Sequence, residues 1–354
     1  MMIREAIPRL LSQENLSYDH SRMIMEEIMS GSATNAQIAA FLTALRIKGE
    51  SVEEIAAFAE VMRERCHVIH PKVSGKLLDT CGTGGDEFRT FNVSTAAAFV
   101  IAGAGVAVAK HGNRSVTSQC GSADVLERFG LSLDTDPDAL SGIIEKVGIG
   151  FMFAPLFHPA MKHAICARKE IGIRTVFNVL GPLTNPASAS VQLLGVYDRS
   201  LVKTIAMVLK NLGCEEAMIV HGLDGLDEVS TIGKTKIAWL RAGVVTSLET
   251  VPSDFGVDQT TADVLRVSTP EESAEATFKV LSGRYPIDDP RMEVVLVNSA
   301  AGIVLGGKAN DFITAMELAR ESVRSGAAYE KLKALLRASG GDVSKLEEME
   351  SKNA

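Results

Sequence analysis

Residues 76–95 read KLLDTCGTGGDEFRTFNVST, and this stretch joins a short apolar run to a glycine-rich turn and then to the start of a helix. Such an order is typical of strand-to-helix turns in α/β proteins. Glycines let the backbone turn tightly and let several N–H groups point at one anion. The stretch therefore predicts an α/β fold, with either an anion-binding loop at 82–86 or an ordinary turn.

The two common phosphate-binding motifs do not match this loop. The dinucleotide-binding fingerprint needs a glycine at position 87, which is Glu87, and the P-loop needs Gly-Lys followed by Ser or Thr, where this chain has Asp86 and Glu87. A phosphate-binding loop here must be of another kind.

Composition argues against several classes of function. The 354 residues contain 36 Lys and Arg against 44 Asp and Glu, a net charge of −8, with no block of like charge. Nucleic-acid and anionic-membrane binding depend on clustered basic residues, so we expect neither. The five cysteines are odd in number and form no CxxC pair, which predicts no zinc site or disulfide framework and a cytoplasmic location. The N-terminus lacks the pattern of a signal peptide, and the longest apolar run, 96–109, is too short to span a membrane.

The chain divides into a helical part and an α/β part. Ser17, Thr34 and Ser51 each precede a segment with helical apolar spacing, and 67–75 resembles a linker. Later apolar runs at 77–78, 106–109, 149–153, 191–196 and 217–220 alternate with helical patterns such as 137–147 and 200–211, and 291–338 is helical again. We predict a small all-helical domain and a large α/β domain with a mainly parallel central sheet flanked by helices.

The predicted boundaries follow from these patterns. The helical domain covers 1–70 and is completed by about 158–188, where a helix-like piece is followed by a proline-bearing loop at 177–187. The α/β domain covers 75–157 and 189–340, and 341–354 form a polar tail.

Polar residues follow the apolar strands in three further places. Ser94 and Thr95 stand at a helix start, where free N–H groups favour an anion, although Ser94 could serve only as the N-cap. Lys110 comes at the end of a buried strand, the edge where open α/β sheets bind ligands, with His111, Asn113 and Arg114 after it.

The third place is an adjacent pair of acids in HGLDGLDEVS, Asp227 and Glu228. A carboxylate pair facing phosphates suits Mg2+, whereas an isolated pair is more often a surface turn. Together, the three strand ends indicate a substrate with several phosphates and a metal.

These residues, in this order, resemble the anthranilate phosphoribosyltransferase family. The motifs that carry the likeness are DTCGTGGD, FNVSTAAAFV, KHGNR, GSADVLE, NVLGPLTNPA and LDEVS, which span nearly the whole chain. The resemblance implies transfer of 5-phosphoribose from phosphoribosyl pyrophosphate to the amine of anthranilate with release of pyrophosphate, the second step of tryptophan biosynthesis from chorismate. It also implies a Mg2+ cofactor, a homodimer formed through the helical domain, and an active site between the domains.

The resemblance also implies a set of site residues. Phosphoribosyl pyrophosphate would be bound by Gly82, Thr83, Gly84, Gly85, Asp86, Asn92, Val93, Ser94, Thr95, Lys110, Gly112, Asn113 and Ser122. Anthranilate would be bound by Gly82, His111, Asn113, His158, Arg168 and Pro182, and the metal by Ser94, Asp227 and Glu228. Because the acceptor is a neutral aromatic amine, no acid, base or nucleophile is expected, and Lys110, Gly82 and Gly85 would act electrostatically.

One stretch departs from the family pattern, and three other readings stay open. Gln119 stands where the family has a cation and Cys120 where it has a hydroxyl, which predicts a change in phosphate affinity. The open readings are a pyrimidine nucleoside phosphorylase, or a transferase for another aromatic amine, and a non-catalytic nucleic-acid-binding relative of the same fold.

Overall fold

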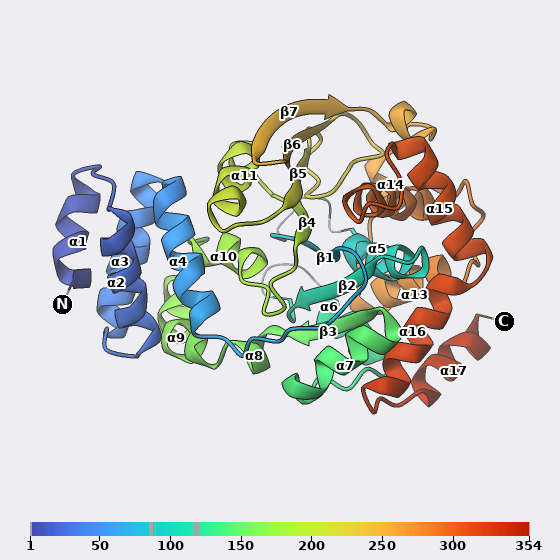
Figure 1. Ribbon diagram of the computed structural model, residues 1–354, viewed down its shortest axis with the longest axis horizontal. Helices are drawn as coiled ribbons and strands as arrows, with labels where there is room; N and C mark the ends of the chain where they lie inside the picture. Colours follow the sequence, from blue (N-terminus) through green and yellow to red (C-terminus); the bar gives the residue numbers. More distant parts are fainter. Residues whose placement is uncertain (1, 85–87, 89, 116–119, 354) are drawn as a thin grey trace.

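The computed structural model describes residues 2–84, 88, 90–115 and 120–353. The apolar runs predicted as strands form part of a seven-stranded sheet (Figure 1). The strand order is β3-β2-β1-β4-β5-β6-β7, and the first five strands in that order run parallel. These parallel strands are β1 (Leu77–Gly82), β2 (Ala107–Gly112), β3 (Ile149–Phe153), β4 (Val191–Gly195) and β5 (Glu216–Gly222). The predicted fold class, including the mainly parallel sheet, is confirmed.

The sequence pattern did not predict the antiparallel end of the sheet. Strands β6 (Thr235–Arg241) and β7 (Val244–Thr250) form a hairpin beside β5. The turn between them consists of Ala242 and Gly243, both with positive φ, 49° and 73°. Asn-Gly or Asp-Gly is the usual sequence signal for such a turn, and Ala-Gly does not carry it.

The N-terminal helices begin at the predicted caps. They are α1 (Met2–Leu11), α2 (Tyr18–Met29), α3 (Asn35–Lys48) and α4 (Val52–Glu64). Ser51 Oγ accepts from the Glu54 N–H at 3.2 Å, and Glu54 Oε2 accepts from the Ser51 N–H at 2.7 Å, so these two residues form a capping box at the start of α4. Thr34 caps α3 in the same way with Gln37, and Ser17 caps α2.

The chain returns to these helices after β3. The returning segment contains α8 (Ala154–Phe157), the 3-10 turn η1 (Pro159–Met161), α9 (Lys162–Ile171) and α10 (Phe177–Leu183). Helix α10 corrects the prediction of a loop at 177–187. Just before it, the Thr175 N–H donates to Asn178 Oδ1 at 2.9 Å, and Pro182 lies one residue before the end of the helix. A proline this close to the end of a helix interrupts little of it.

Two hydrophobic cores lie on the two faces of the sheet. One contains α5 (Val93–Gly103), α6 (Ser122–Arg128), α7 (Pro137–Val147) and the C-terminal helices, together with Leu193 and Met218. The other contains α11 (Leu201–Asn211), the N-terminal helices, and α9 and α10, together with Leu194 and Ile219. Strand neighbours alternate between the faces, so both faces are apolar, as expected of a covered parallel sheet. The division into two domains stays a prediction, since one core includes both the N-terminal helices and one face of the sheet.

The linker and the C-terminal part complete the fold. The 67–75 segment forms no helix or strand and is held by the His67 N–H, which donates to the Phe157 carbonyl at 2.9 Å. The later elements are η2 (Pro252–Phe255), α12 (Ala262–Leu265), α13 (Pro270–Leu281), α14 (Pro290–Leu305), α15 (Phe312–Arg324), α16 (Ala327–Ala338) and α17 (Ser344–Lys352).

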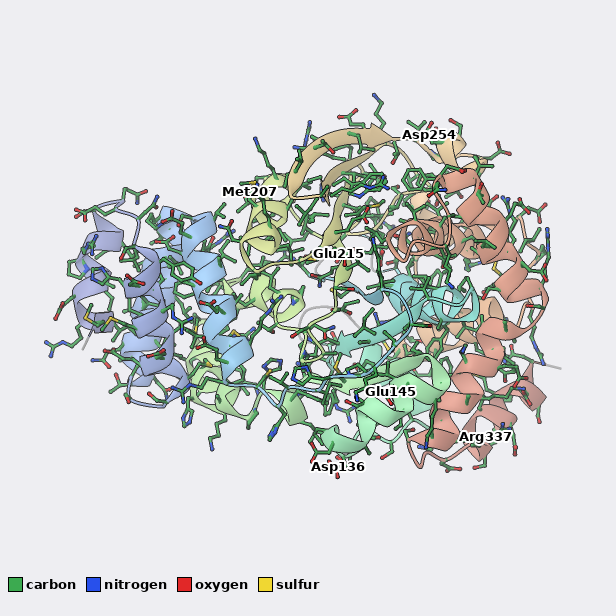
Figure 2. All side chains as sticks on the ribbon, viewed as in Figure 1. Asp136, Glu145, Met207, Glu215, Asp254 and Arg337 are labelled. Atoms are coloured by element: carbon green, nitrogen blue, oxygen red, sulfur yellow. The ribbon has the colours of Figure 1, made fainter. Side chains whose placement is uncertain are left out.

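Helix α17 occupies most of the segment predicted as a polar tail, 341–354. Its one fully buried side chain is Leu346, and the Tyr329 hydroxyl donates to Glu350 at 2.5 Å. Charged side chains such as Asp136, Asp254 and Arg337 project from the outer surface (Figure 2). In the described part of the chain, no helix is both long and apolar enough to cross a membrane.

Two glycines inside helices give a matched test of the packing. A Cβ added at Gly302 of α14 would lie 2.4 Å from Ile101 Cδ1 on α5, whereas one added at Gly142 of α7 meets nothing within 4 Å. We expect Gly302→Ala to lower the free energy of unfolding by roughly 1–3 kcal/mol, because it overpacks the α5–α14 contact. Gly142→Ala should raise it by roughly 0.5–1 kcal/mol through helix propensity. Urea unfolding followed by circular dichroism measures both, and equal effects would contradict the close α5–α14 contact.

Candidate active site

The parallel strands end at one edge of the sheet, and the glycine loop begins there at the end of β1. The Thr83 N–H donates to the Gly195 carbonyl at 2.9 Å, and Thr83 Oγ1 accepts from the Tyr197 N–H at 3.0 Å. These bonds attach the start of the loop to the end of β4, beside the edge where open α/β sheets bind ligands.

The acidic pair lies directly against this loop. Asp227 Oδ2 accepts from the Gly84 N–H at 2.8 Å, and Gly84 has the positive φ of 68° that favours glycine. A Cβ added at Gly82 would lie 2.6 Å from Asp227 Oδ2, and one added at Gly195 would lie 1.5 Å from the Asp227 carbonyl oxygen. The glycines therefore let the loop after β5 approach the ends of β1 and β4.

Lys110 supplies a buried cation at the same edge. Its side chain is 3% exposed, and Nζ donates to the Thr80 carbonyl at 2.7 Å and lies 3.4 Å from Ser94 Oγ. Burial lowers the pKa of Lys110, while the negative charges of Asp79 and Glu228 act in the opposite direction. The ammonium group is thus held between β1 and the start of α5, in the electrostatic field of the acidic pair.

The start of α5 differs in detail from the prediction. Asn92, not Ser94, is its N-cap, and Ser94 lies inside the first turn. The Asn92 side chain is bonded to the protein: Nδ2 donates to the Cys120 carbonyl at 3.2 Å, and Oδ1 accepts from Ser273 Oγ at 2.7 Å. Val93 is buried in the core, so only its backbone can meet a ligand. The buried Thr95 hydroxyl has no hydrogen-bond partner within the described structure.

The loop after β2 contributes backbone and hydroxyl groups. A Cβ added at Gly112 would lie 2.3 Å from Ser122 Oγ, so Ser122 lies against that glycine at the first turn of α6. Asn113 is exposed. Arg114 is turned toward α6, where it forms two bonds to Glu127 at 2.7 and 2.8 Å. Of the two cations in KHGNR, Lys110 alone is directed toward the start of α5.

Two histidines form a neutral pair on the side of the returning segment. The rings of His111 and His158 lie 5.0 Å apart between centroids, both are buried, and neither Nε2 has a hydrogen-bond partner among the described residues. Burial lowers the pKa of His111 to about 3, with a further contribution from His158, and it lowers the pKa of His158 to about 4. The His111 ring donates a hydrogen bond to the Gly181 backbone and the His158 ring to the Thr184 backbone, which connects both rings to the end of α10.

Arg168 and Pro182 belong to the same segment. The Arg168 guanidinium lies over the Phe177 ring, 4.9 Å from its centroid, and no carboxylate of the described residues forms an ion pair with it. Burial lowers the pKa of Arg168. The Pro182 carbonyl accepts from Gln192 Nε2 at 2.6 Å. A partly buried guanidinium with no carboxylate partner among the described residues is suited to an anionic ligand.

Sequence reasoning missed three buried polar side chains behind the site. Asp79, Gln192 and Asn185 lie on β1, on β4 and just after α10. Burial raises the pKa of Asp79 to about 6, while Asn185, Lys110 and the His111 N–H act in the opposite direction. The available signal was a polar residue within an apolar strand, as in LLDTCG and VQLLG.

Some predicted positions lie outside the described residues, namely Gly85, Asp86 and Gln119. Cys120 is described, and burial raises the pKa of its thiol to about 11. The thiol is therefore protonated at neutral pH and has little of the thiolate character that oxidation requires.

Comparison with known proteins supports one reading of this site. The chain is 51% identical over 340 residues to an anthranilate phosphoribosyltransferase of Methanocorpusculum labreanum, covering 96% of this chain and 99% of the relative. The structure matches that of the anthranilate phosphoribosyltransferase of Thermus thermophilus with a TM-score of 0.87 at 37% identity, covering 95% and 99% of the two chains. It matches the Saccharomyces cerevisiae enzyme, solved in complex with PRPP and Mg, with a TM-score of 0.85 at 30% identity, covering 96% and 98%.

Two family models account for most of the chain. Residues 4–66 match the helical bundle domain of the glycosyl transferase family, and residues 74–329 match its α/β domain. The two matched ranges correspond to the N-terminal helices and to the part of the chain that contains the sheet. The relatives named above also align over nearly their whole length. The chain therefore belongs to the glycosyl transferase family whose members include the anthranilate phosphoribosyltransferases.

Proposed function

We propose that this protein transfers 5-phosphoribose from phosphoribosyl pyrophosphate to the amine of anthranilate and releases pyrophosphate. The observation that carries the proposal is the arrangement at the sheet edge. A buried ammonium, a carboxylate pair and a glycine loop meet on one side, with two neutral histidines and a partly buried guanidinium on the side of α9 and α10. The first set suits a multiply charged phosphate substrate, and the second suits an aromatic acid.

The phosphate substrate would be bound around Lys110 and the first turn of α5. Candidate groups are the backbone and side chains of Gly82, Thr83, Gly84, Gly85, Asp86, Asn92, Val93, Ser94, Thr95, Gly112, Asn113 and Ser122. The Gly84 N–H now donates to Asp227 and the Thr83 N–H to Gly195. Since both N–H groups already have protein acceptors, the loop would have to rearrange before these two groups could bind pyrophosphate.

The acidic pair fits Mg2+ by the chemistry of its donors. Asp227 and Glu228 are 8% and 9% exposed, and the described residues contain no cluster of three or more His, Cys, Asp or Glu side chains for a fully protein-bound metal. Mg2+ prefers one or two carboxylates and takes its other ligands from water and phosphate oxygens. Asp227 and Glu228 would hold it, with Ser94 as a further oxygen donor. Bound Mg2+ would neutralise charge on the pyrophosphate.

The acceptor would bind beside the histidine pair and the end of α10. His111 and His158 are uncharged at neutral pH and present an aromatic surface, while Arg168 would pair with the acceptor's carboxylate. Gly82, Asn113 and Pro182 complete the proposed acceptor set.

The chemical step needs charge stabilisation more than proton transfer. The amine nitrogen attacks C1′ of the ribose, the bond from C1′ to the pyrophosphate oxygen breaks, and the electron pair leaves with pyrophosphate. The new nitrogen–carbon bond releases one proton, which water can accept because the product is a weakly basic aromatic amine. Lys110 stabilises the negative charge that develops on the leaving oxygen. Holding the donor and the acceptor side by side would align the amine nitrogen with C1′.

We also propose a homodimer formed through the N-terminal helices, in the cytoplasm. Several of the large apolar side chains that are exposed lie on this part of the chain and on the segment that returns to it, namely Leu11, Met23, Ile47, Ile165 and Ile173. Exposed apolar side chains on these helices would be covered in such a dimer.

The decisive experiment is a direct assay of the purified protein. Anthranilate and phosphoribosyl pyrophosphate are incubated with and without Mg2+, and the phosphoribosylated product and pyrophosphate are detected by liquid chromatography and mass spectrometry. Thymidine or uridine with phosphate, and other aromatic amines, are the alternative substrates. Product from one of these and none from anthranilate would overturn the proposal.

A double substitution tests the assignment of Asp227 and Glu228 as metal ligands. Asp227→Asn with Glu228→Gln should lower kcat/KM by roughly 100-fold or more at saturating Mg2+, because the phosphate substrate loses its charge-neutralising partner. The exposed adjacent pair on α17, changed by Glu347→Gln with Glu348→Gln, serves as the matched control and should keep wild-type kinetics. A fully active Asp227/Glu228 double variant would exclude these two residues as metal ligands.

A single substitution tests the assignment of Arg168 as the partner of the acceptor's carboxylate. Arg168→Ala should raise the KM for anthranilate by roughly tenfold or more while changing the KM for phosphoribosyl pyrophosphate by less than about twofold, because only the acceptor's carboxylate loses a partner. Lys169→Ala, at the exposed neighbouring position of α9, is the control. Equal changes in both KM values would contradict the carboxylate role.

The neutral histidines predict an acid-sensitive stability. Because their folded pKa values of about 3 and 4 lie below the usual 6.5, the unfolded chain binds more protons below pH 6.5. This contribution to stability is therefore complete above pH 6.5 and is lost as the pH falls toward 4. Asp79, with its raised pKa of about 6, has the opposite effect between pH 6 and about 4 and offsets part of the loss.

The free energy of unfolding, measured with urea at pH 7 and pH 5, tests this pH dependence of stability. His111→Gln should lose less stability between the two pH values than the wild type, by up to roughly 2 kcal/mol. His158→Gln tests the other ring in the same way. Identical pH dependence in the wild type and both variants would show that the rings do not stay neutral on folding.

A further inference from the structure

A polar cluster is buried beneath the acceptor side of the site and has no part in the proposed chemistry. It consists of Asp79 on β1, Gln192 on β4 and Asn185 just after α10, which are 0%, 4% and 5% exposed. Asp79 and Gln192 are register partners on neighbouring parallel strands, so their side chains lie on the same face of the sheet.

Gln192 connects two different elements through one nitrogen. Its Nε2 donates to the Pro182 carbonyl of α10 at 2.6 Å and lies 3.4 Å from Asp79 Oδ2. Asp79 Oδ1 in turn accepts from the His111 N–H at 3.3 Å. The contacts form one path from the end of α10, through Gln192 and Asp79, to the His111 backbone on β2.

Asn185 makes a second connection between the same elements. Its Nδ2 donates to the Ala109 carbonyl of β2 at 2.8 Å, its Oδ1 accepts from the Ala187 N–H at 2.9 Å, and its side chain is also hydrogen-bonded to Asp79. The end of α10 and the end of β2 are thus both bonded to one buried carboxylate.

This placement is costly for stability alone. A buried polar side chain must recover its lost hydration through hydrogen bonds, and an apolar side chain at position 192 would avoid that requirement. Strand β4 is otherwise apolar apart from its final glycine. The Gln192 amide instead fixes the distance and orientation of α10 relative to the sheet.

The cluster serves the acceptor side and not the phosphate side. Successive strand residues point to opposite faces, so Asp79 lies on the face opposite Thr80, and His111 on the face opposite Lys110. Lys110 Nζ contacts Ser94 of α5, whereas the ring of His111 meets His158 and the Gly181 backbone.

We propose that Gln192 is a positioning residue for the acceptor subsite, acting through Pro182 and Asp79 to hold the end of α10 against His111. The inference rests on the proposed function, because it assigns anthranilate to the side of α10 and His111. Gln192 does not touch the reacting atoms; it sets the width of the subsite through the α10 backbone.

Gln192→Met tests this by removing the hydrogen bonds that the side-chain amide donates, among them those to Pro182 and Asp79, while keeping the length of the side chain. The KM for anthranilate should rise roughly five- to tenfold, and the KM for phosphoribosyl pyrophosphate should change by less than about twofold. The control is Ser322→Ala, which removes one buried hydrogen bond, from Ser322 Oγ to the Val100 carbonyl at 2.8 Å, far from the acceptor side. Ser322→Ala should lower Tm and leave both KM values unchanged.

A second variant tests the hydrogen bond itself. In Gln192→Glu a deprotonated carboxyl would face the Pro182 carbonyl and Asp79 and could not donate, whereas a protonated carboxyl could donate to one of them. The ratio of the variant's anthranilate KM to that of the wild type should therefore fall toward one as the pH is lowered from 8 to 6. This pH-dependent rescue would not occur if the substitution only lowered the amount of folded enzyme.

The outcomes separate the two proposals. If the wild type forms no phosphoribosylated anthranilate, the proposed function fails and this inference fails with it. If the wild type is active, but Gln192→Met changes neither KM or both equally, and Gln192→Glu shows no rescue at low pH, Gln192 is only structural and the inference alone is overturned. A Gln192→Met variant that does not fold leaves the decision to Gln192→Glu.

Discussion

The site depends on how closely the loop after β5 approaches the ends of two other strands. A Cβ at Gly195 would lie 1.5 Å from the Asp227 carbonyl oxygen, and one at Gly82 would lie 2.6 Å from its carboxylate. No residue other than glycine fits these positions with the backbone as it is. The glycines therefore leave space for the acidic pair as well as letting the loop bend. The acidic pair then lies beside Gly84 and near the positive charge of Lys110.

The sheet separates two chemical environments at one edge. On the α5 side, Lys110 and Ser94 provide a buried positive charge and a hydroxyl. On the α10 side, His111 and His158 stay neutral because burial opposes their protonation. Adjacent residues on β2, Lys110 and His111, point to opposite faces, so one strand contributes to both environments. An anionic donor and an aromatic acceptor can therefore meet at the edge of the sheet where this strand ends.

Much of the fold follows from local sequence patterns. The caps at Ser17, Thr34 and Ser51 and the strands at 149–153 and 191–196 could be read from side-chain type and spacing, because caps and strand alternation depend on neighbours in the chain. The hairpin of β6 and β7 was missed, since its Ala-Gly turn has no strong signal and its strands are stabilised by pairing with β5. Helix α10 was missed because Pro182 suggested a loop, and only the burial of Phe177, Leu180 and Leu183 supports a helix there.

By itself the sequence determined the fold class, the family and the groups that could bind phosphate and metal, since glycine loops, helix starts and acid pairs are local motifs. Only the tertiary structure decided what those groups touch. It directed Arg114 to Glu127, made Asn92 the N-cap of α5, and set Asp227 against Gly84. It also revealed the buried Asp79 and Gln192, whose meaning depends on the register of two strands more than a hundred residues apart. In KLLDTCGTGGD the glycines predict a loop, but the need for glycine at Gly82 comes from the carboxylate of Asp227, which the chain supplies from the end of β5.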